Sequence, residues 1–336
     1  MIIKNLRSRI ISVGTVVGGA EKSGPMGKKF DFTDDTDRFG QDTWEKAESE
    51  MQKIALALAL KKSGLSADSL GAIFAGDLLN QCVGSTYGLL EYNVPYYGLY
   101  GACSTSAEGL MLASMTTSAG HFDIAASVTS SHNCSAERQY RSPIEYGGQK
   151  PPSAQWTVTG SGAFIVAGER AMPDEKGVLV TEALPGIVID KGVTDANNMG
   201  AAMAPAALST LVRYFSESEN RPSDFDMILT GDLGDIGSEI LCELMRAEGL
   251  DITPIHNDCG KMIYEGIEHP DVNSGGSGCG CAATVVGAHI IPMLMSGELK
   301  NVLFMATGAM MSPSSIQQGL SIPSVAHLLH LKYNNN

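Results

Sequence analysis

An internal duplication restricts the possible folds of this chain more than any other feature. A shift of 155 residues places Gly76-Asp77-Leu78 on Gly231-Asp232-Leu233, and a shift of 178 residues places Cys103 on Cys281. The matched segments share one order of strand-like and helix-like runs. The larger second shift indicates an insertion around residues 255–278. Two copies of one strand–helix pattern predict two similar α/β units packed together.

The duplication divides the sequence into two predicted units, 1–170 and 171–336. Residues 44–62 are apolar on almost every side and predict a largely buried helix. Residues 131–157 combine turn formers with little periodicity, which predicts an irregular loop. Polar residues that follow the predicted strands are expected at the carboxyl edge of a sheet, where α/β proteins build their sites.

Charge and composition narrow the classes of function. The 336 residues carry a formal net charge of −14, which argues against nucleic-acid binding and repels anionic lipids. The apolar run 281–295 contains a histidine and a proline and is shorter than the roughly 20 residues of a membrane span. Seven scattered cysteines fit a reducing compartment. We expect no direct membrane insertion, so that work at a membrane requires a protein partner.

Cys103 is placed at a predicted strand-to-helix turn, between the apolar run 94–100 and the helix-like run 108–113. The positive end of a helix favours a thiolate, which predicts a lowered pKa and a nucleophile or an anion contact. Because free cysteines are often buried for packing alone, a structural role is the alternative.

Five polar residues at the ends of predicted strands are candidates for ligand binding. The strands are predicted over 70–75, 122–130 and 252–255, and the residues are Asp77, Asn80, His132, His256 and Asn257. For the two histidines, a purely structural hydrogen bond is an alternative that the sequence leaves open. Three cations of the predicted loop, Arg138, Arg141 and Lys150, are further candidates. Pairing with Glu137 and Glu145 is the alternative for each of them.

Several motifs resemble known families. The turn Ala102-Cys103-Ser104-Thr105-Ser106 is similar to the nucleophile turn of ketoacyl synthases and thiolases. Longer motifs, spread from end to end, resemble the stage V sporulation protein AD family of spore-forming bacteria. They include Gly76-Asp77-Leu78-Leu79-Asn80-Gln81, Ser130-Ser131-His132-Asn133, Glu145-Tyr146-Gly147-Gly148-Gln149-Lys150-Pro151, His256-Asn257-Asp258-Cys259-Gly260 and Gly275-Gly276-Ser277-Gly278-Cys279.

This resemblance implies an α/β thiolase-like fold, in which two βαβαβαββ halves pack as a five-layered αβαβα sandwich. It also implies a protein that binds dipicolinic acid, with or without calcium, for uptake into the developing spore and release on germination. Its implied partners are integral membrane subunits of one transport complex, and its implied place is the cytoplasmic (forespore) face of the spore inner membrane, as a peripheral protein. By analogy with the fold, a homodimer joined at the first-half sheets is expected.

Condensing enzymes of this fold need two polar residues from the second half, a pair of His or a His and an Asn, to form a carbanion and hold an oxyanion. Gly231-Asp232 occupies the first position and offers no imidazole. The second falls near Gly275–Cys281, which contains neither residue type, although Asn273 is close. We therefore expect a protein that is not an enzyme. An acyltransferase or condensing enzyme using Cys103 is the alternative, and a scaffold with a vestigial pocket is a third.

A flat aromatic dianion requires N–H donors or cations for its carboxylates. The expected ligand-binding set is Cys103, Asp77, Asn80, His132, Lys150, Arg138, His256 and Asn257. Asp77 and Asn80 could hold calcium or orient the turn. The motif Cys279-x-Cys281 with Cys259 is a weak signal for zinc, because no second paired motif accompanies it. No cofactor and no resident metal are expected.

Overall fold

Two five-stranded groups with the same strand order form the framework of the protein. The computed structural model describes residues 1–140, 150–172, 176–267 and 271–334. The first group runs β4-β3-β5-β7-β1 and the second runs β10-β9-β12-β13-β8, with the same parallel and antiparallel pairings. The strands are β1 (Ser8–Val17), β3 (Ala72–Gly76), β4 (Tyr96–Gly98), β5 (Ile124–Ser131), β7 (Gly160–Gly168), β8 (Val178–Leu184), β9 (Met227–Thr230), β10 (His256–Asp258), β12 (Asn301–Ala309) and β13 (Ser324–Lys332). The predicted duplication is confirmed.

The two groups are joined at one edge of each, where Ser8, Arg9 and Ile10 pair with Val180, Leu179 and Val178. A short strand β2 (Phe32–Thr33) pairs in parallel with the end of β1. A separate two-stranded sheet pairs β6 (Trp156–Thr157) with β11 (Gly276–Ser277), so that a first-half and a second-half segment lie side by side.

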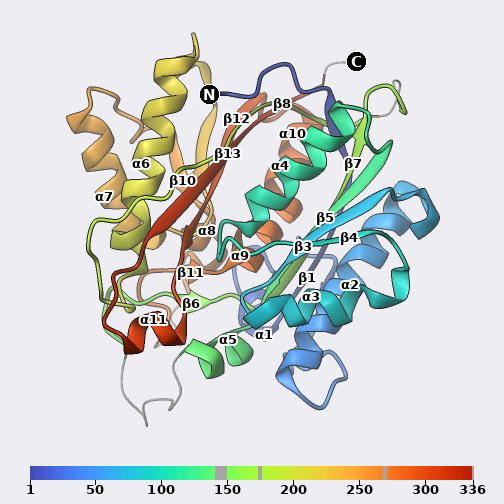
Figure 1. Ribbon diagram of the computed structural model, residues 1–336, viewed down its shortest axis with the longest axis horizontal. Helices are drawn as coiled ribbons and strands as arrows, with labels where there is room; N and C mark the ends of the chain where they lie inside the picture. Colours follow the sequence, from blue (N-terminus) through green and yellow to red (C-terminus); the bar gives the residue numbers. More distant parts are fainter. Residues whose placement is uncertain (141–149, 173–175, 268–270, 335–336) are drawn as a thin grey trace.

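Helices complete a five-layered arrangement, as predicted (Figure 1). α2 (Trp44–Ser63) and α3 (Val83–Leu89) lie on the outer side of the first half, and α6 (Met199–Glu217) and α7 (Gly234–Ala247) on the outer side of the second. α4 (Thr105–Ser118) lies in the middle beside a continuous helical run of α9 (Cys279–Val285), the π-helical turn η5 (Val286–Ile290) and α10 (Ile291–Ser296). The shorter helices are α1 (Gly19–Lys22), α5 (Asn133–Tyr140), α8 (Cys259–Tyr264) and α11 (Pro313–Gln317).

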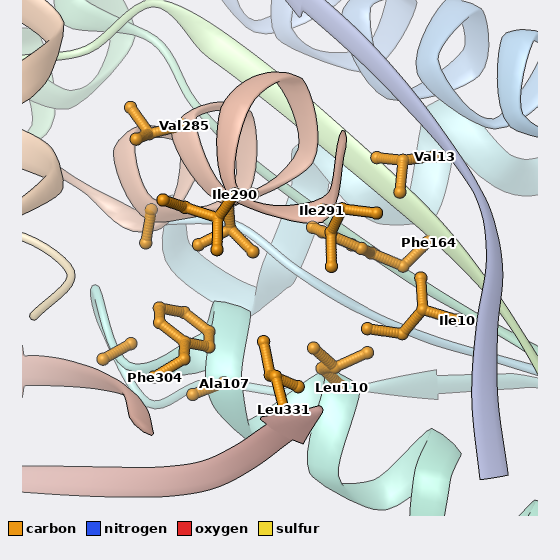
Figure 2. Close-up of a cluster of buried hydrophobic side chains, with 14 of the residues drawn as sticks. Ile10, Val13, Ala107, Leu110, Phe164, Val285, Ile290, Ile291, Phe304 and Leu331 are labelled. Atoms are coloured by element: carbon orange, nitrogen blue, oxygen red, sulfur yellow. The ribbon is translucent and has the colours of Figure 1, made fainter. Parts of the chain in front are cut away.

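The middle layer forms the largest hydrophobic core. Figure 2 shows Ile290 and Ile291 pointing from their helix toward Leu110, Phe304 and Leu331. Each fully buried aliphatic or aromatic side chain of this kind contributes roughly 1.5–3 kcal/mol. Because these side chains come from both halves, the core joins the halves as well as filling them.

The helical run Cys279–Ser296 is long and apolar enough to cross a membrane, by length and composition alone. In the structure, 67% of this run is buried inside the protein. It packs between the two sheet groups, and its apolar composition is therefore explained by the core.

One segment differs from the predicted irregular loop. Helix α5 occupies Asn133–Tyr140 within it. The Ser135 hydroxyl donates to the His132 carbonyl at 3.1 Å and to the buried Glu48 carboxyl at 2.7 Å, which fixes the first turn of this helix. The long-range contact with Glu48 stabilises a helix that the sequence, lacking apolar periodicity, does not predict. Residues 141–149, with the candidate Arg141, lie outside the described residues.

Candidate functional site

The turn that carries Cys103 is held in place by its own hydrogen bonds. Thr105 Oγ1 accepts from the Gly101 amide at 2.9 Å and donates to the Ala102 carbonyl at 2.7 Å. Ala102 adopts a left-handed conformation with φ of 50°, which is unusual for a residue with a side chain. Cys103 follows it directly and precedes Ser104, the N-cap of α4. The thiol is thus fixed just before the helix begins.

Two side chains of the second half surround the thiol. The Ser277 hydroxyl lies 3.8 Å from the Cys103 sulfur and 3.2 Å from the Asp232 carboxylate. Asp232 follows β9, and it also accepts the Gly278 amide at 3.0 Å and the Thr307 hydroxyl at 3.1 Å. These groups that fix Asp232 all come from the second half, so the first half supplies the thiol and the second supplies its polar surroundings.

The electrostatics of this site are opposite to the sequence-based expectation. Burial, and next the negative charge of Asp232, raises the pKa of the Cys103 thiol well above its usual range. Burial also raises the pKa of Asp232 to about 6, although the hydrogen bonds it accepts lower it. The prediction of a lowered thiol pKa is therefore wrong, because burial beside a carboxylate outweighs the helix terminus. The resting thiol is protonated and weakly nucleophilic at neutral pH.

Replacing Asp232 by Asn is expected to make Cys103 more reactive toward iodoacetamide. The substitution removes the negative charge that opposes thiolate formation. Each unit by which the thiol pKa falls increases the thiolate population about tenfold. The alkylation rate at pH 8, followed by mass spectrometry of the Cys103 peptide, measures this effect.

The control for Asp232→Asn is Thr307→Val, which removes one hydrogen bond to Asp232 and keeps the charge. It should react at the wild-type rate. An alkylation rate in Asp232→Asn equal to or below that of the wild type would contradict the assignment of the charge effect.

A narrow cavity of about 50 Å³ opens beside Cys103. Its lining is mostly apolar, with the Cys103 thiol and the Ser277 and Thr157 hydroxyls as neutral polar groups and Glu137 as the acid. α5, β6, β11 and the end of β12 all contribute to it. The remaining lining residues are Leu78, Ala102, Ala136, Tyr140, Met199, Ala309 and Met311.

The sequence and the fold were then compared with known proteins. Residues 2–332 match the sequence model of the family described as stage V sporulation protein AD. The chain belongs to this family. It is 43% identical over 318 residues to the stage V sporulation protein AD of Bacillus subtilis (strain 168), covering 94% of this chain and 91% of that protein.

Solved structures with the same fold are enzymes of low sequence identity. The cerulenin-bound form of OleA from Xanthomonas campestris, obtained by soaking, aligns with a TM-score of 0.63 at 12% identity, over 98% of this chain and 100% of that one. The 3-oxoacyl-[acyl-carrier-protein] synthase III of Aquifex aeolicus VF5 aligns with a TM-score of 0.57 at 12% identity, over 97% and 100%. At this identity the likeness concerns the fold alone, and it confirms the predicted thiolase-like architecture.

Of the two predicted cations that the structure describes, Lys150 is the one that contacts a lining residue of the Cys103 cavity. Its Nζ is 3.3 Å from the Glu137 carboxylate of the lining and 4.9 Å from the centre of the Trp156 ring. Arg138 instead forms an ion pair with Glu45 of α2. Both cations therefore have carboxylate partners, as the sequence left open, but Lys150 has its partner at the cavity.

Asp77 and Asn80 lie at the end of β3, beside the cavity residue Leu78. The Asp77 carboxylate is buried and accepts the Leu79 amide at 2.9 Å and the Ser85 amide at 2.7 Å. Asn80 is exposed, and its backbone N–H donates to the side-chain oxygen of Gln139 at 2.8 Å. Asp77 therefore orients its own turn, and neither side chain belongs to the cavity lining.

The two candidate histidines lie away from the thiol. His132 Nε2 is 2.8 Å from the Asp37 carbonyl, and the ring packs on Trp44. His256 Nε2 is 3.0 Å from the Thr230 hydroxyl. Burial lowers the pKa of His132, and it lowers the pKa of His256 to about 4. Both are neutral, hydrogen-bonded residues outside the cavity lining.

The strand predicted over residues 252–255 is wrong, because the strand of this region begins at His256. The Ile255 and His256 amides both bond to the Ile252 carbonyl and close a turn, and β10 begins only at His256. Asn257 belongs to β10, and its side-chain oxygen accepts the Asp258 amide at 2.8 Å. Asn257 is therefore also outside the cavity lining.

The described part of the chain contains no group of three or more His, Cys, Asp or Glu side chains placed to hold a metal ion. The three cysteines of the zinc alternative are free and buried. The Cys279 thiol donates to the Ser130 carbonyl at 2.9 Å. Gly280, between Cys279 and Cys281, lies so close to β7 that a Cβ would be 2.3 Å from the Gly160 carbonyl oxygen. This spacing serves close packing of α9 against β7.

Proposed function

We propose that this chain is a non-catalytic, thiolase-fold sporulation protein that binds dipicolinate in the Cys103 cavity. The observation that supports this function best is the pairing of Cys103 with Asp232 and Ser277. A condensing enzyme needs imidazole or amide groups here to form a carbanion and hold an oxyanion. A carboxylate raises the barrier to both steps, because it opposes the developing negative charge.

The cavity is narrow and has to widen to admit dipicolinate. Its 50 Å³ are too small for any drug-sized ligand without side-chain movement, since binding pockets usually measure about 300–1,000 Å³. Met199 and Met311 line the wall, and methionine side chains adapt readily to a ring. An aromatic ring between these side chains would place its carboxylates toward the polar groups of the lining.

Charge favours entry of the ligand together with calcium. Glu137 lines the cavity and Asp232 lies behind Ser277, so a bare dianion meets two carboxyl groups. Lys150 is already paired with Glu137 and supplies one positive charge. A calcium ion on the dicarboxylate would neutralise the ligand and accept the Glu137 carboxylate as a further oxygen ligand.

Calorimetric titration with dipicolinate tests this function. We expect saturable binding to one site per chain, stronger with calcium, and a loss of affinity of about tenfold or more in Lys150→Gln, in line with one charge-assisted contact. Isophthalate is the matched control ligand, because it has the same two carboxylates and lacks the ring nitrogen that helps to chelate calcium. Lys61→Gln on the exposed end of α2 is the matched control variant and should bind as the wild type does.

Absence of saturable binding by folded wild-type protein, with and without calcium, would overturn the proposal. Incubation with an acyl-CoA then tests the acyltransferase alternative, since a nucleophilic Cys103 would gain the mass of the acyl group. Wild-type affinity in Lys150→Gln would place the ligand elsewhere.

The proposed role includes transport of dipicolinate into the spore and its release on germination, with the chain held at the spore inner membrane by integral membrane subunits.

A second copy of this chain is a further proposed partner. β4 is an edge strand of its sheet, and exposed side chains gather on and before it: Tyr87, Leu90, Tyr96 and Tyr97. An exposed edge strand with such side chains favours pairing with another strand.

A further inference from the structure

Helix α5 forms one wall of the Cys103 cavity and buries little of its surface. It supplies Ala136, Glu137 and Tyr140 to the lining and lies beside both α2 and β6 (Figure 1). Of its eight residues, Ser135 and Ala136 are the buried ones. Elements with few buried contacts open at a low cost in free energy, and a cavity of about 50 Å³ has to widen for a ligand. α5 is therefore well placed to move when a ligand enters.

A buried carboxyl group of α2 holds the first turn of α5. The Ser135 hydroxyl lies 2.7 Å from Glu48 Oε2 and 3.1 Å from the His132 carbonyl oxygen. The single hydroxyl proton cannot serve both acceptors fully. With a proton on Oε2, Glu48 donates to Ser135 Oγ, and the Ser135 hydroxyl is then available to His132. The geometry around Ser135 therefore fits a protonated Glu48.

The second oxygen of Glu48 fits the same protonation state. Glu48 Oε1 accepts the Ser130 hydroxyl at 3.0 Å, and Ser130 Oγ in turn accepts the Gln52 side-chain amide at 2.8 Å. Asp77 accepts the Ser85 hydroxyl and two backbone amides, which favour its ionised form. Burial, and next the charge of Asp77, raises the pKa of Glu48 to about 8. Glu48 therefore carries the proton of this buried pair, and Asp77 carries the charge.

The other ionisable groups around Glu48 belong to α2, to α9 and to the residue before α5. Glu45 of α2 forms an ion pair with Arg138 of α5. Burial, followed by the charge of Glu48, raises the pKa of the Cys279 thiol of α9 well above its usual range. Burial lowers the pKa of His132, so that its ring is neutral. Glu48 is therefore the group of this cluster that changes its charge as pH approaches 8.

We propose that Glu48 and Ser135 form a latch that holds α5 over the Cys103 cavity, and that dipicolinate enters when this latch opens. When α5 moves away, Glu48 loses the Ser135 acceptor and gains water. The pKa of Glu48 then falls toward its ordinary value of 4.5, and at neutral pH the proton leaves to solvent. Opening is therefore coupled to the release of one proton and becomes easier as pH rises toward 8. The role in ligand entry rests on the proposed dipicolinate function, whereas the latch itself does not.

Hydrogen exchange of the α5 amides, measured by mass spectrometry on the ligand-free full chain, tests the latch. Relative to the intrinsic exchange rate, the protection of α5 in the wild type should fall about tenfold or more between pH 6.5 and pH 8, because each pH unit changes a one-proton equilibrium by up to tenfold. In Glu48→Gln the protection should be independent of pH, since the glutamine amide donates to Ser135 at every pH. Ser135→Ala should lower the protection at both pH values.

Glu45→Gln is the matched control for this experiment. It removes another link between α2 and α5, the ion pair with Arg138, and leaves Glu48 in place. The protection of α5 in Glu45→Gln should be lower than in the wild type but should change with pH in the same way. Wild-type protection that does not change with pH, or an equal change in Glu48→Gln, would overturn the latch.

Calorimetric titration with dipicolinate at pH 7.5, in two buffers of different ionisation enthalpy, tests the role of the latch in ligand entry. We expect the wild type to release roughly half a proton or more per bound ligand, and Glu48→Gln to release less by that amount. Binding with equal proton release by both proteins would overturn this role. If α5 loses protection with pH and dipicolinate does not bind, the latch is supported and the proposed dipicolinate function fails, so the two failures are distinguishable.

Discussion

Gly308→Ala is expected to destabilise the protein by about 3 kcal/mol or more, at the upper end of the range for overpacked cores. A Cβ at this position of β12 would lie 2.0 Å from the Gly101 carbonyl oxygen and 3.1 Å from the Ser104 backbone nitrogen. Both contacts are with backbone atoms of the Cys103 turn, which cannot rotate away as a side chain does. The second half therefore presses directly on the turn that carries the thiol, and the substitution must push the two apart.

Urea unfolding followed by circular dichroism measures this effect as a lower midpoint. Gly98→Ala is the matched control, because the nearest atoms to its new Cβ belong to the side chain of the exposed Tyr96, at 3.2 Å. The control should unfold near the wild-type midpoint. A Gly308→Ala midpoint equal to that of the control would mean that β12 and the turn separate at little cost. Reduced dipicolinate affinity in folded Gly308→Ala would follow from the same displacement.

Much of the fold was predictable because the two halves repeat the same local chemistry. Helix α2 is an example. The Thr43 side chain accepts the Lys46 amide at its start, and Gly64 ends it with φ of 69°. Ala55 and its neighbours allow β1 to approach so closely that a Cβ on Gly14 would lie 2.1 Å from the Ala55 carbonyl oxygen. The N-cap, the small residues and the terminal glycine of α2 are all visible in the local sequence. They agree with the close packing of this helix on β1.

The site was less predictable, because its polar groups meet only through long-range packing. Asp77 and Asp232 hold the same place in the repeated motif, and both are buried and accept backbone amides. Asp232 lies at the thiol because Ser277 and Gly278, just before α9, connect it to Cys103. The sequence repeat identifies both aspartates, but it does not predict that Asp232, and not Asp77, lies beside Cys103.

The predicted ligand set shows the same limit. Strand ends correctly predicted that Asp77 and His132 lie at a sheet edge, but the directions of their side chains depend on partners farther away in sequence. The His132 side chain forms a hydrogen bond with the backbone carbonyl of Asp37, which lies 95 residues earlier in the chain. Conversely, Tyr140, Met199 and Met311 line the cavity and gave no signal in the sequence, because aromatic and methionine side chains are equally common in cores.

Beneath the candidate site, α2 contributes a buried carboxyl group that the proposed function does not use. Glu48 is fully buried and accepts the Ser130 hydroxyl at 3.0 Å and the Ser135 hydroxyl at 2.7 Å. Burial, and next the charge of Asp77, raises the pKa of Glu48 to about 8. Glu48 is therefore mostly protonated at neutral pH, whereas in the unfolded chain it is ionised. This difference connects stability to pH.

Glu48→Gln is expected to remove a large part of the loss of stability between pH 6.5 and pH 8. Over this range the folded wild type holds a proton on Glu48 that the unfolded chain, with a pKa near 4.5, has released. Stability therefore falls as pH rises, by on the order of 2 kcal/mol for one proton over this interval. The buried His256 and His327, whose pKa values are about 4, act in the opposite direction only below the unfolded value of 6.5.

Glutamine matches the shape of the protonated acid, because its oxygen can accept from one serine hydroxyl while its NH2 group donates to the other. Glu48→Gln should therefore be more stable than the wild type at both pH values, and by a larger margin at pH 8. Thermal unfolding at the two pH values measures the difference. Glu239→Gln, on the exposed face of α7, is the control and should keep the wild-type dependence. Glu21 and Asp258, whose pKa values burial raises to about 7, leave a smaller residual slope in Glu48→Gln. If the stability of Glu48→Gln and of the wild type changed with pH in parallel, Glu48 would be ionised in the folded protein, which would contradict the prediction.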